Sequence, residues 1–340
     1  MTRRGDDDRA GRDDALDGLI HAVDLDGLVR TIDDRCADHD WAGLLRLRDR
    51  CLAATRESGR QLWPAATLAE YRLALLAPPE WAASVLDGEA GRFTIGPLSE
   101  VVAVHHTWHD LQPHLPRVPV ATFVAHERAI RGESIAPETL ADLPPVIDIP
   151  AAVQPWEPAY PVSTYRDVGA EHPEPALAGH LEHVTVAEVG ALVEDDATEL
   201  AVRSLLDAWT TTSTGHAEVV CVEGDALGAL GALGVRSARM IEIPTGEALA
   251  RIAWAGASGG AHGRRRGMAI GRFSMWWLLG ALGHLHDHWP PTNTDMTMLL
   301  EDLRWYRWDA HEPPGGWRLQ LAVDDADEGL AWAINASDHA

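Results

Sequence analysis

The stretch WRLQLAVDDADEGLAWAIN, residues 317–335, decides the fold class of this chain. Apolar side chains occupy every second position on both sides of its polar turn DDADEG: Trp317, Leu319, Leu321 and Val323 before the turn, and Leu330, Trp332 and Ile334 after it. A period of two predicts strands that bury one face, and the turn joins the two strands into a β-hairpin. We therefore expect the chain to end in β structure.

Two further β-rich runs, AEVVCVE (217–223) and ARMIEI (238–243), flank the small-residue segment DALGALGALGV. This pattern predicts a strand–helix–strand unit, which brings the expected number of strands to about four. Helices are expected at 246–257, 268–285 and 295–309. A further helix is expected from the capping box Thr185-Val186-Ala187-Glu188 to about Trp209. Residues 181–340 are therefore predicted to form an α+β domain.

The first part of the chain has a helical pattern. Residues 1–14 are nearly all charged, Gly or Ala and are predicted to be a disordered tail. Residues 15–134 are predicted to be an all-α domain that contains a helical hairpin, in which WAGLLRLRDRCLAA and WPAATLAEYRLALLA meet near Ser58-Gly59. Residues 135–180 are expected to be an extended connector, because nine of the chain's 21 prolines lie between Pro137 and Pro175.

Composition excludes several classes of function. The 340 residues contain no lysine and carry a formal net charge of −24, so Schiff-base chemistry and a phosphate-loop lysine are excluded. Nucleic acid and anionic membranes are not expected partners of so acidic a chain. The longest apolar run, Phe273–Leu285, is shorter than a membrane span, and Cys36, Cys51 and Cys221 form no C-x-x-C pair. We expect a cytoplasmic protein with reduced, buried thiols.

The segment GGAHGRRRGMAIGR, residues 259–272, is the strongest candidate for a binding site. It precedes an expected helix, and a helix N-terminus carries unpaired N–H groups and partial positive charge that attract anions. Glycines let backbone amides approach such a ligand, and arginines bind phosphate bidentately. We predict a site for a phosphate-type anion at Gly260, Gly263, Arg264, Arg265, Arg266, Gly267 and Arg272. The alternative is that the chain's own carboxylates balance these arginines.

Residues 264–269, RRRGMA, resemble the R-x-x-G-x-A signature of the acetyl-CoA-dependent N-acyltransferases. Arg264, Gly267 and Ala269 match this signature position by position. The resemblance implies that the loop amides hold the pyrophosphate of coenzyme A. In that family the signature follows a strand, whereas EALARIAWAGA, which precedes it here, has a helical pattern.

Histidines give a second candidate site. In VVAVHHTWHDLQPHL, His105 and His109 are four residues apart and would share one face of a helix, a spacing that zinc-binding helices use. His126 and Glu127 could add ligands from a neighbouring helix. No H-E-x-x-H motif or cysteine partner is present, so histidines bonded to backbone or acids are the preferred interpretation and no metal is predicted.

Two further motifs have structural interpretations. The segment HLHDH, residues 284–288, ends the expected helix, where cationic imidazoles are favourable. In LRWYRWDA, residues 303–310, the aromatic rings could stack on bases while Arg304 and Arg307 contact phosphates. Because the chain is acidic, we prefer the interpretation that the rings lie on one face of a helix and pack in the protein core.

The segments AGASGGAHGRRRGMAIGRFSMWW, LRWYRWDA and GLAWAINASD resemble an uncharacterised family of actinobacterial proteins, as do GRFTIGPLSEV and HTWHDLQPHLP. The resemblance implies no activity or cofactor. We expect a binding or scaffold protein, which binds either a partner protein through the helical domain or a phosphate-type anion at residues 259–272. The alternative is an enzyme that uses coenzyme A or another phosphorylated cofactor there, with Glu247 or Asp309 as the base. The oligomeric state stays open.

Overall fold

The C-terminal hairpin lies inside a seven-stranded antiparallel sheet. In the computed structural model, which describes residues 14–86, 95–116, 119–141, 143, 146–176, 178–312 and 315–339, the hairpin consists of β8 (Trp317–Asp325) and β9 (Leu330–Asp338). Leu321 lies opposite Ile334, and Val323 lies opposite Trp332. These side chains are buried, but so is Ala322 on the opposite face, so the expectation of one buried face is wrong because helices cover both faces of the sheet. The predicted hairpin is confirmed.

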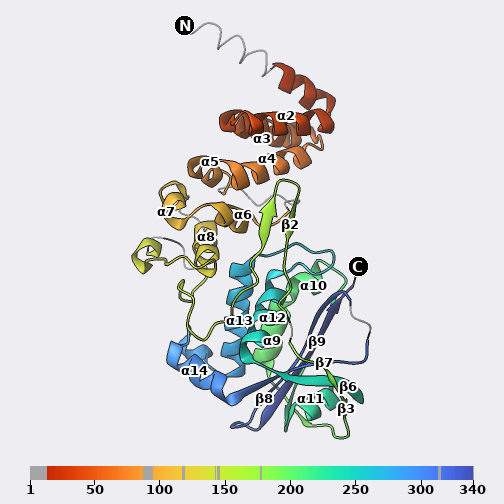
Figure 1. Ribbon diagram of the computed structural model, residues 1–340. Helices are drawn as coiled ribbons and strands as arrows, with labels where there is room; N and C mark the ends of the chain where they lie inside the picture. Colours follow the sequence, from red (N-terminus) through yellow and green to blue (C-terminus); the bar gives the residue numbers. More distant parts are fainter. Residues whose placement is uncertain are drawn as a thin grey trace. The chain divides into compact units, whose positions relative to one another are not determined.

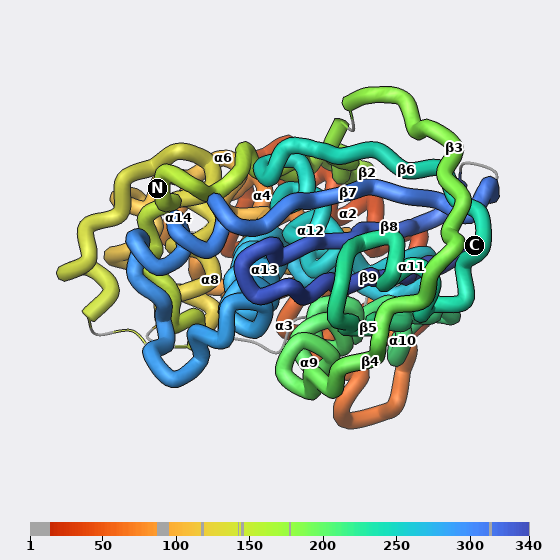
Figure 2. Tube along the Cα trace, turned by 90° about the horizontal axis from the view of Figure 1, so that it is seen from below, coloured from red at the N-terminus to blue at the C-terminus, as the bar shows by residue number. Residues whose placement is uncertain are grey.

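The strand order of the sheet is β3-β6-β7-β8-β9-β5-β4. Figure 2 shows the strands side by side in this order, from β6 near the top to β4 near the bottom. The remaining strands are β3 (Glu182–Thr185), β4 (Ala191–Val193), β5 (His216–Glu223), β6 (Ser237–Ile243) and β7 (Leu303–Asp309). The α+β class is therefore confirmed, with seven strands in this sheet where about four were expected.

Helices cover both faces of this sheet (Figure 1). On one face, α11 (Ala226–Ala232) packs on Val222, Met240 and Trp308, which share a cluster of buried side chains. On the other face, α12 (Thr245–Ala257) packs on β7 and β8, and α9 (Asp196–Leu205) packs on β5. The helices α12 and α13 (Met268–Leu282) pack closely together. The remaining helical segments are α10 (Asp207–Thr211), η3 (His286–His288) and α14 (Asn293–Asp302).

Residues 303–309 are a central strand, so the expected helix over 295–309 is wrong in its second half. The helix α14 ends at Asp302, and β7 starts at Leu303 between β6 and β8. The aromatic residues of LRWYRWD suit a strand as well as a helix. Pairing with two strands from elsewhere in the chain decides between the two.

The expected helix from Thr185 to about Trp209 is also wrong at its start. Residues 182–185 form β3, which pairs with β6, and residues 191–193 form β4, which pairs with β5. The helix α9 starts only at Asp196, where the side chain of Asp195 accepts a hydrogen bond from the Thr198 N–H at 3.1 Å. Sheet pairing has therefore overridden the local capping signal.

The chain divides into two compact units, each described here by itself. The described residues within 1–128, 138–144 and 164–171 form the first unit, and those within 129–137, 145–163 and 172–340 form the second. The first unit is helical and includes the predicted hairpin of α3 (Trp41–Ser58) and α4 (Trp63–Leu76). Its other elements are a helix over residues 14–22, α2 (Leu25–Ala37), α5 (Pro79–Ala83), α6 (Leu98–His105), α7 (Trp108–Leu111), η1 (Gln112–His114), α8 (Pro119–Ile130), which extends past its boundary, η2 (Pro137–Leu140), which crosses its boundary, β1 (Thr164–Arg166) and β2 (Gly169–Glu171).

The Pro-rich stretch expected to be a connector contributes to both units. The hairpin β1–β2 lies in the first unit, where the hydroxyl of Tyr165 donates to Glu100 at 2.5 Å. Residues 146–163 lie in the second unit. Across the described residues, no helix is both long and apolar enough to cross a lipid bilayer. The tail predicted at residues 1–14 falls almost wholly outside the described residues.

Candidate functional site

The loop between α12 and α13 holds a carboxylate of the chain itself. The backbone N–H of Ala261 donates to Oδ2 of Asp338 at 2.6 Å, and Asp338 is 1% exposed. Gly260 has a φ of 68°, and a Cβ at this position would lie 2.1 Å from the same oxygen. The glycine therefore permits the close approach of a carboxylate from β9 to the loop.

The other loop glycines allow close backbone packing. A Cβ on Gly263 would lie 2.2 Å from the carbonyl oxygen of Gly259 and 2.6 Å from the hydroxyl of Thr212. Gly267 is the N-cap residue of α13, with a φ of 96° and no capping side chain. These glycines make the loop compact against α10.

Arg266 caps a neighbouring helix. Its Nη1 donates to the carbonyl oxygens of Ser204 at 3.0 Å and Leu205 at 3.3 Å, at the C-terminal end of α9. A cation is favourable at this end of a helix. Burial lowers the pKa of Arg266, and the nearby charge of Asp207 opposes that shift. Arg264 and Arg265 also have partners of their own.

Arg272 forms a buried ion pair with Glu157. Its Nε and Nη2 donate to the two carboxylate oxygens, each at 2.6 Å, and both side chains are 0% exposed. The same guanidinium donates to the carbonyl oxygens of Ala151 and Ala152. Burial lowers the pKa of Arg272, but the hydrogen bonds and charge of Glu157 outweigh it and raise the pKa above its usual value. The arginine therefore anchors residues 151–157 to α13.

The histidine candidates lie on different elements. His105 ends α6 and His109 lies on α7, because the helix breaks at His106 and Thr107 caps α7. Both histidines are exposed. His126 is 1% exposed on α8. Within the described part of the chain, no group of three or more His, Cys, Asp or Glu side chains could hold a metal ion.

Four arginines surround a cleft in the second unit whose lining includes neither the loop over 259–272 nor the histidine candidates. The cleft has a volume of about 500 Å³ and is lined by Arg239, Arg251, Arg307 and Arg318 together with Glu174, Asp309 and Glu312. We call it the arginine cleft. It lies where the sheet parts: the pairing between β7 and β8 stops at Arg307 and Leu321, although β7 continues to Asp309 and β8 begins at Trp317.

Three of these arginines have carboxylate partners. Arg239 binds Asp309 bidentately at 2.9 and 2.8 Å, Arg251 pairs with Glu174, and Arg318 pairs with Glu312 at 3.0 Å. The Arg251 guanidinium also lies 4.3 Å from the ring of Trp254. Burial raises the pKa of Asp309, but hydrogen bonds from Arg239 and from the His311 N–H outweigh it and hold that pKa below its usual range.

Arg307 has no carboxylate within ion-pair distance among the described residues. Its Nη2 reaches only the carbonyl oxygens of Ala178 and Gly179, at 3.5 and 3.4 Å, which are long for hydrogen bonds. Its Nε is buried without a partner among the described residues, as are the Nε of Arg318 and the Nε1 of Trp308. Burial lowers the pKa of Arg251, and the charge of Arg307 lowers it further. The cleft therefore contains a cation without a carboxylate partner and two guanidinium Nε groups without partners among the described residues, whereas the Trp308 ring packs with α11.

The sequence predicts roles for two members of this cleft separately, Arg307 as a possible phosphate contact and Asp309 as a possible base. In the structure, Asp309 holds Arg239 in a bidentate ion pair. The other proposed base, Glu247, accepts a hydrogen bond from the Ala178 N–H at 3.2 Å. Arg239 and Arg318 are far apart in the sequence, and the pairing of β6, β7 and β8 brings them together. Arg251 comes from α12, which packs on β7 and β8.

Comparison with known proteins gives a family and no activity. No curated protein and no solved structure matches the chain. One family model matches residues 26–340, which is nearly the whole chain. The chain belongs to DUF6183, a family of unknown function.

Proposed function

We propose that this protein binds a small molecule carrying a phosphate or carboxylate group in the arginine cleft. The observation that carries the proposal is Arg307, a guanidinium in the cleft without a carboxylate partner among the described residues. Arg307 is half-buried, and its guanidinium gains from an opposite charge and from hydrogen-bond acceptors at shorter distances than Ala178 and Gly179 provide. An anion in the cleft supplies both to Arg307.

Charge and size support the proposal. Four arginines and three carboxylates line the cleft, a local balance of +1 in a chain with a net charge of −24. The volume of about 500 Å³ falls within the range of sites for small molecules and exceeds what a single phosphate ion fills. The expected ligand is therefore an organic anion.

The rim of the cleft can adjust to a ligand. The Arg318–Glu312 pair lies at 3.0 Å with the Glu312 side chain 45% exposed. Exposed ion pairs of this kind contribute roughly 0–1 kcal/mol, so an anion can replace Glu312 at little cost. The Arg318 guanidinium released from Glu312 then gives that anion a second cation beside Arg307.

The loop over 259–272 is the weaker location for the same ligand class. The Ala261 amide donates to Asp338, Arg266 donates to α9 and Arg272 pairs with Glu157. Coenzyme A at this loop would have to displace Asp338. We therefore favour binding at the arginine cleft over the alternative of an enzyme that uses coenzyme A at the loop. A partner of the helical unit stays a prediction.

A thermal-shift panel tests the proposal. The panel contains inorganic phosphate, pyrophosphate, citrate, adenosine nucleotides, coenzyme A and acetyl-CoA. A ligand present at about 100 times its dissociation constant stabilises the protein by roughly 2.7 kcal/mol, which raises the midpoint by several degrees. Arg307→Gln should abolish the shift. The matched control is Arg304→Gln, an exposed arginine on the same strand that does not line the cleft. The proposal is contradicted if no compound raises the unfolding midpoint, or if both variants lose the ligand-induced shift equally.

A further inference from the structure

The outer edge of β5 is largely unoccupied. The strand β5 pairs with β9 along its whole length, from His216 to Glu223. On its other side, β4 covers only Cys221 to Glu223. Among the described residues, no strand and no loop backbone bonds to this side of residues 216–220. Edge strands with free N–H and C=O groups bind additional strands, and natural proteins usually protect them.

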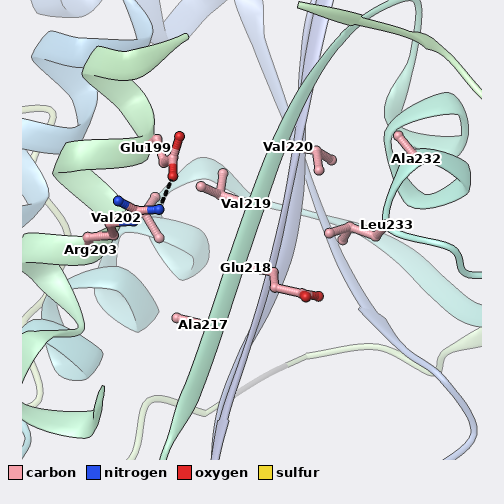
Figure 3. Close-up of a pocket in the computed structure, with 9 residues that line it drawn as sticks. All are labelled: Glu199, Val202, Arg203, Ala217, Glu218, Val219, Val220, Ala232 and Leu233. Carbon is pink, nitrogen blue, oxygen red and sulfur yellow. Dashed lines mark ion pairs between the residues drawn. The ribbon is translucent and has the colours of Figure 1, made fainter. Parts of the chain in front are cut away.

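This edge forms the floor of a groove. Figure 3 shows β5 running between α9, which carries Val202, and the end of α11, which carries Leu233. The groove has a volume of about 310 Å³ and continues into a second one of about 500 Å³ beside β4. Val219 and Val220 line both grooves. A slot with one open strand edge and two helical walls fits an extended chain.

The groove is strongly acidic. Its two parts are lined by one arginine, Arg203, and by five carboxylates, a local balance of −4. The carboxylates are Glu194, Asp195, Asp196, Glu199 and Glu218. The side chains of Glu199 and Glu218 are 42% and 52% exposed and remain accessible to a partner. Asp195 has a structural role as well, because it caps α9 and accepts from Trp332 at 2.8 Å.

We propose that an extended, basic segment of a partner protein binds along residues 216–220 as an added β-strand. Five strand residues span about 16 Å, so a segment of about five to seven residues covers the open edge. Successive side chains of the segment would lie on opposite faces of the sheet, one set beside Glu199 and Val219 on the α9 side and the other beside Glu218 and Leu233 on the α11 side (Figure 3). Each face therefore offers a carboxylate to an arginine or lysine and an apolar surface to its neighbours. A second copy of this chain is a poor occupant, because its own β5 edge carries the same negative charge.

The test uses a fluorescein-labelled seven-residue peptide in which arginine alternates with valine. Binding to the full chain is followed by fluorescence anisotropy, and hydrogen exchange follows the amides of residues 216–220. We expect binding, slower exchange of these amides, and at least tenfold weaker binding of the same peptide with glutamate in place of arginine. The variant Glu199→Arg/Glu218→Arg should weaken binding at least tenfold. The matched control, Glu301→Arg/Glu328→Arg, changes two exposed acids outside both grooves and should bind as the unmodified protein does.

Backbone methylation separates strand addition from simple charge attraction. In a β-strand, the backbone N–H and C=O groups of every second residue bond to the neighbouring strand on one side. Two peptides, N-methylated at the arginines or at the valines, should therefore differ at least tenfold in affinity. Equal affinity of the two methylated peptides, unchanged exchange at residues 216–220, or no binding of the arginine peptide would overturn the proposal.

Discussion

Arg272 and Glu157 form a bidentate ion pair at 2.6 Å in which neither side chain is exposed to solvent. The pair joins the first turns of α13 to a segment 115 residues earlier in the chain. Trp156 and Trp276 pack beside it with ring centroids 4.8 Å apart. An arginine that the sequence suggested as an anion ligand therefore has a carboxylate of the chain as its partner.

Loss of one partner of this pair should strongly destabilise the second unit. Arg272→Met leaves Glu157 buried and uncompensated, which costs about 3–5 kcal/mol of unfolding free energy. Arg203→Met is the control, since Arg203 is 72% exposed in its pair with Glu199 and should cost less than about 1 kcal/mol. Urea unfolding followed by tryptophan fluorescence measures both changes. Equal costs would show that burial does not govern the Arg272 pair.

Gly260 should tolerate alanine less well than Gly234 does. Both have a positive φ, 68° and 83°, but only at Gly260 would a Cβ meet another atom, the Asp338 carboxylate. The strained backbone alone costs about 1–2 kcal/mol, and overpacking adds about 1–3 kcal/mol. Thermal unfolding of Gly260→Ala and Gly234→Ala compares the two. If the two variants lose the same stability, Asp338 does not occupy the loop as described.

The Asp309 carboxylate should stabilise the fold at neutral pH and lose this effect in acid. Its pKa is lowered from 3.8 in the folded protein, because hydrogen bonds from Arg239 and the His311 N–H outweigh burial. The contribution is therefore present above the pKa of the unfolded chain and disappears as the pH falls through the lower folded value. The stability difference between the unmodified protein and Asp309→Asn, measured by urea unfolding at pH 7 and pH 3, should shrink in acid.

Asp302 gives a control for which substitution by asparagine should change the unfolding free energy at pH 7 in the opposite direction. Slight desolvation of this exposed carboxyl, together with the neighbouring charges of Asp327 and Asp325, raises its pKa from 3.8. Its ionisation therefore opposes folding, and Asp302→Asn should stabilise the protein at pH 7 and have less effect at pH 3. A stabilising Asp309→Asn at pH 7 would contradict the assigned role of the Arg239 pair.

The three thiols should react slowly in the folded protein. Burial raises the pKa of Cys36, Cys51 and Cys221 to about 11. The thiolate is the reactive form, so at pH 8 the rate of alkylation should fall roughly a hundredfold below that of an unfolded thiol of pKa about 8.5. Labelling with iodoacetamide, with and without denaturant, followed by mass spectrometry, measures each site. Fast labelling of Cys51 in the native state would contradict its burial.

Local patterns were sufficient where neighbours in sequence determine the structure. The alternation over 317–335 predicted β8 and β9, and the spacing of apolar residues predicted α3, α4, α12 and α13. The same kind of local pattern wrongly predicted helix at the strands within residues 182–193 and at residues 303–309. Both segments pair with strands that are distant in sequence. A capping box and a helical stripe are local signals, and such pairing outweighs them.

The candidate site was less predictable than the fold. The sequence favours the arginines in and after the glycine-rich loop as an anion site, yet Arg266 and Arg272 have partners within the chain. The arginine cleft depends on the point at which β7 and β8 part, and no sequence motif marks that point. Of its lining residues, the sequence singles out only Arg307 and Asp309, which lie in the aromatic segment LRWYRWDA.

The most direct test of anion binding is the NMR signal of the Arg307 Nε–H group. It is assigned by its loss in Arg307→Gln and followed while pyrophosphate, citrate, adenosine nucleotides, coenzyme A or acetyl-CoA is added. We predict that at least one of these anions shifts the Arg307 signal in a saturable manner and leaves that of Arg304 in place. If none of them moves the Arg307 signal, or if Arg304 moves equally, the arginine cleft is not a binding site for such anions.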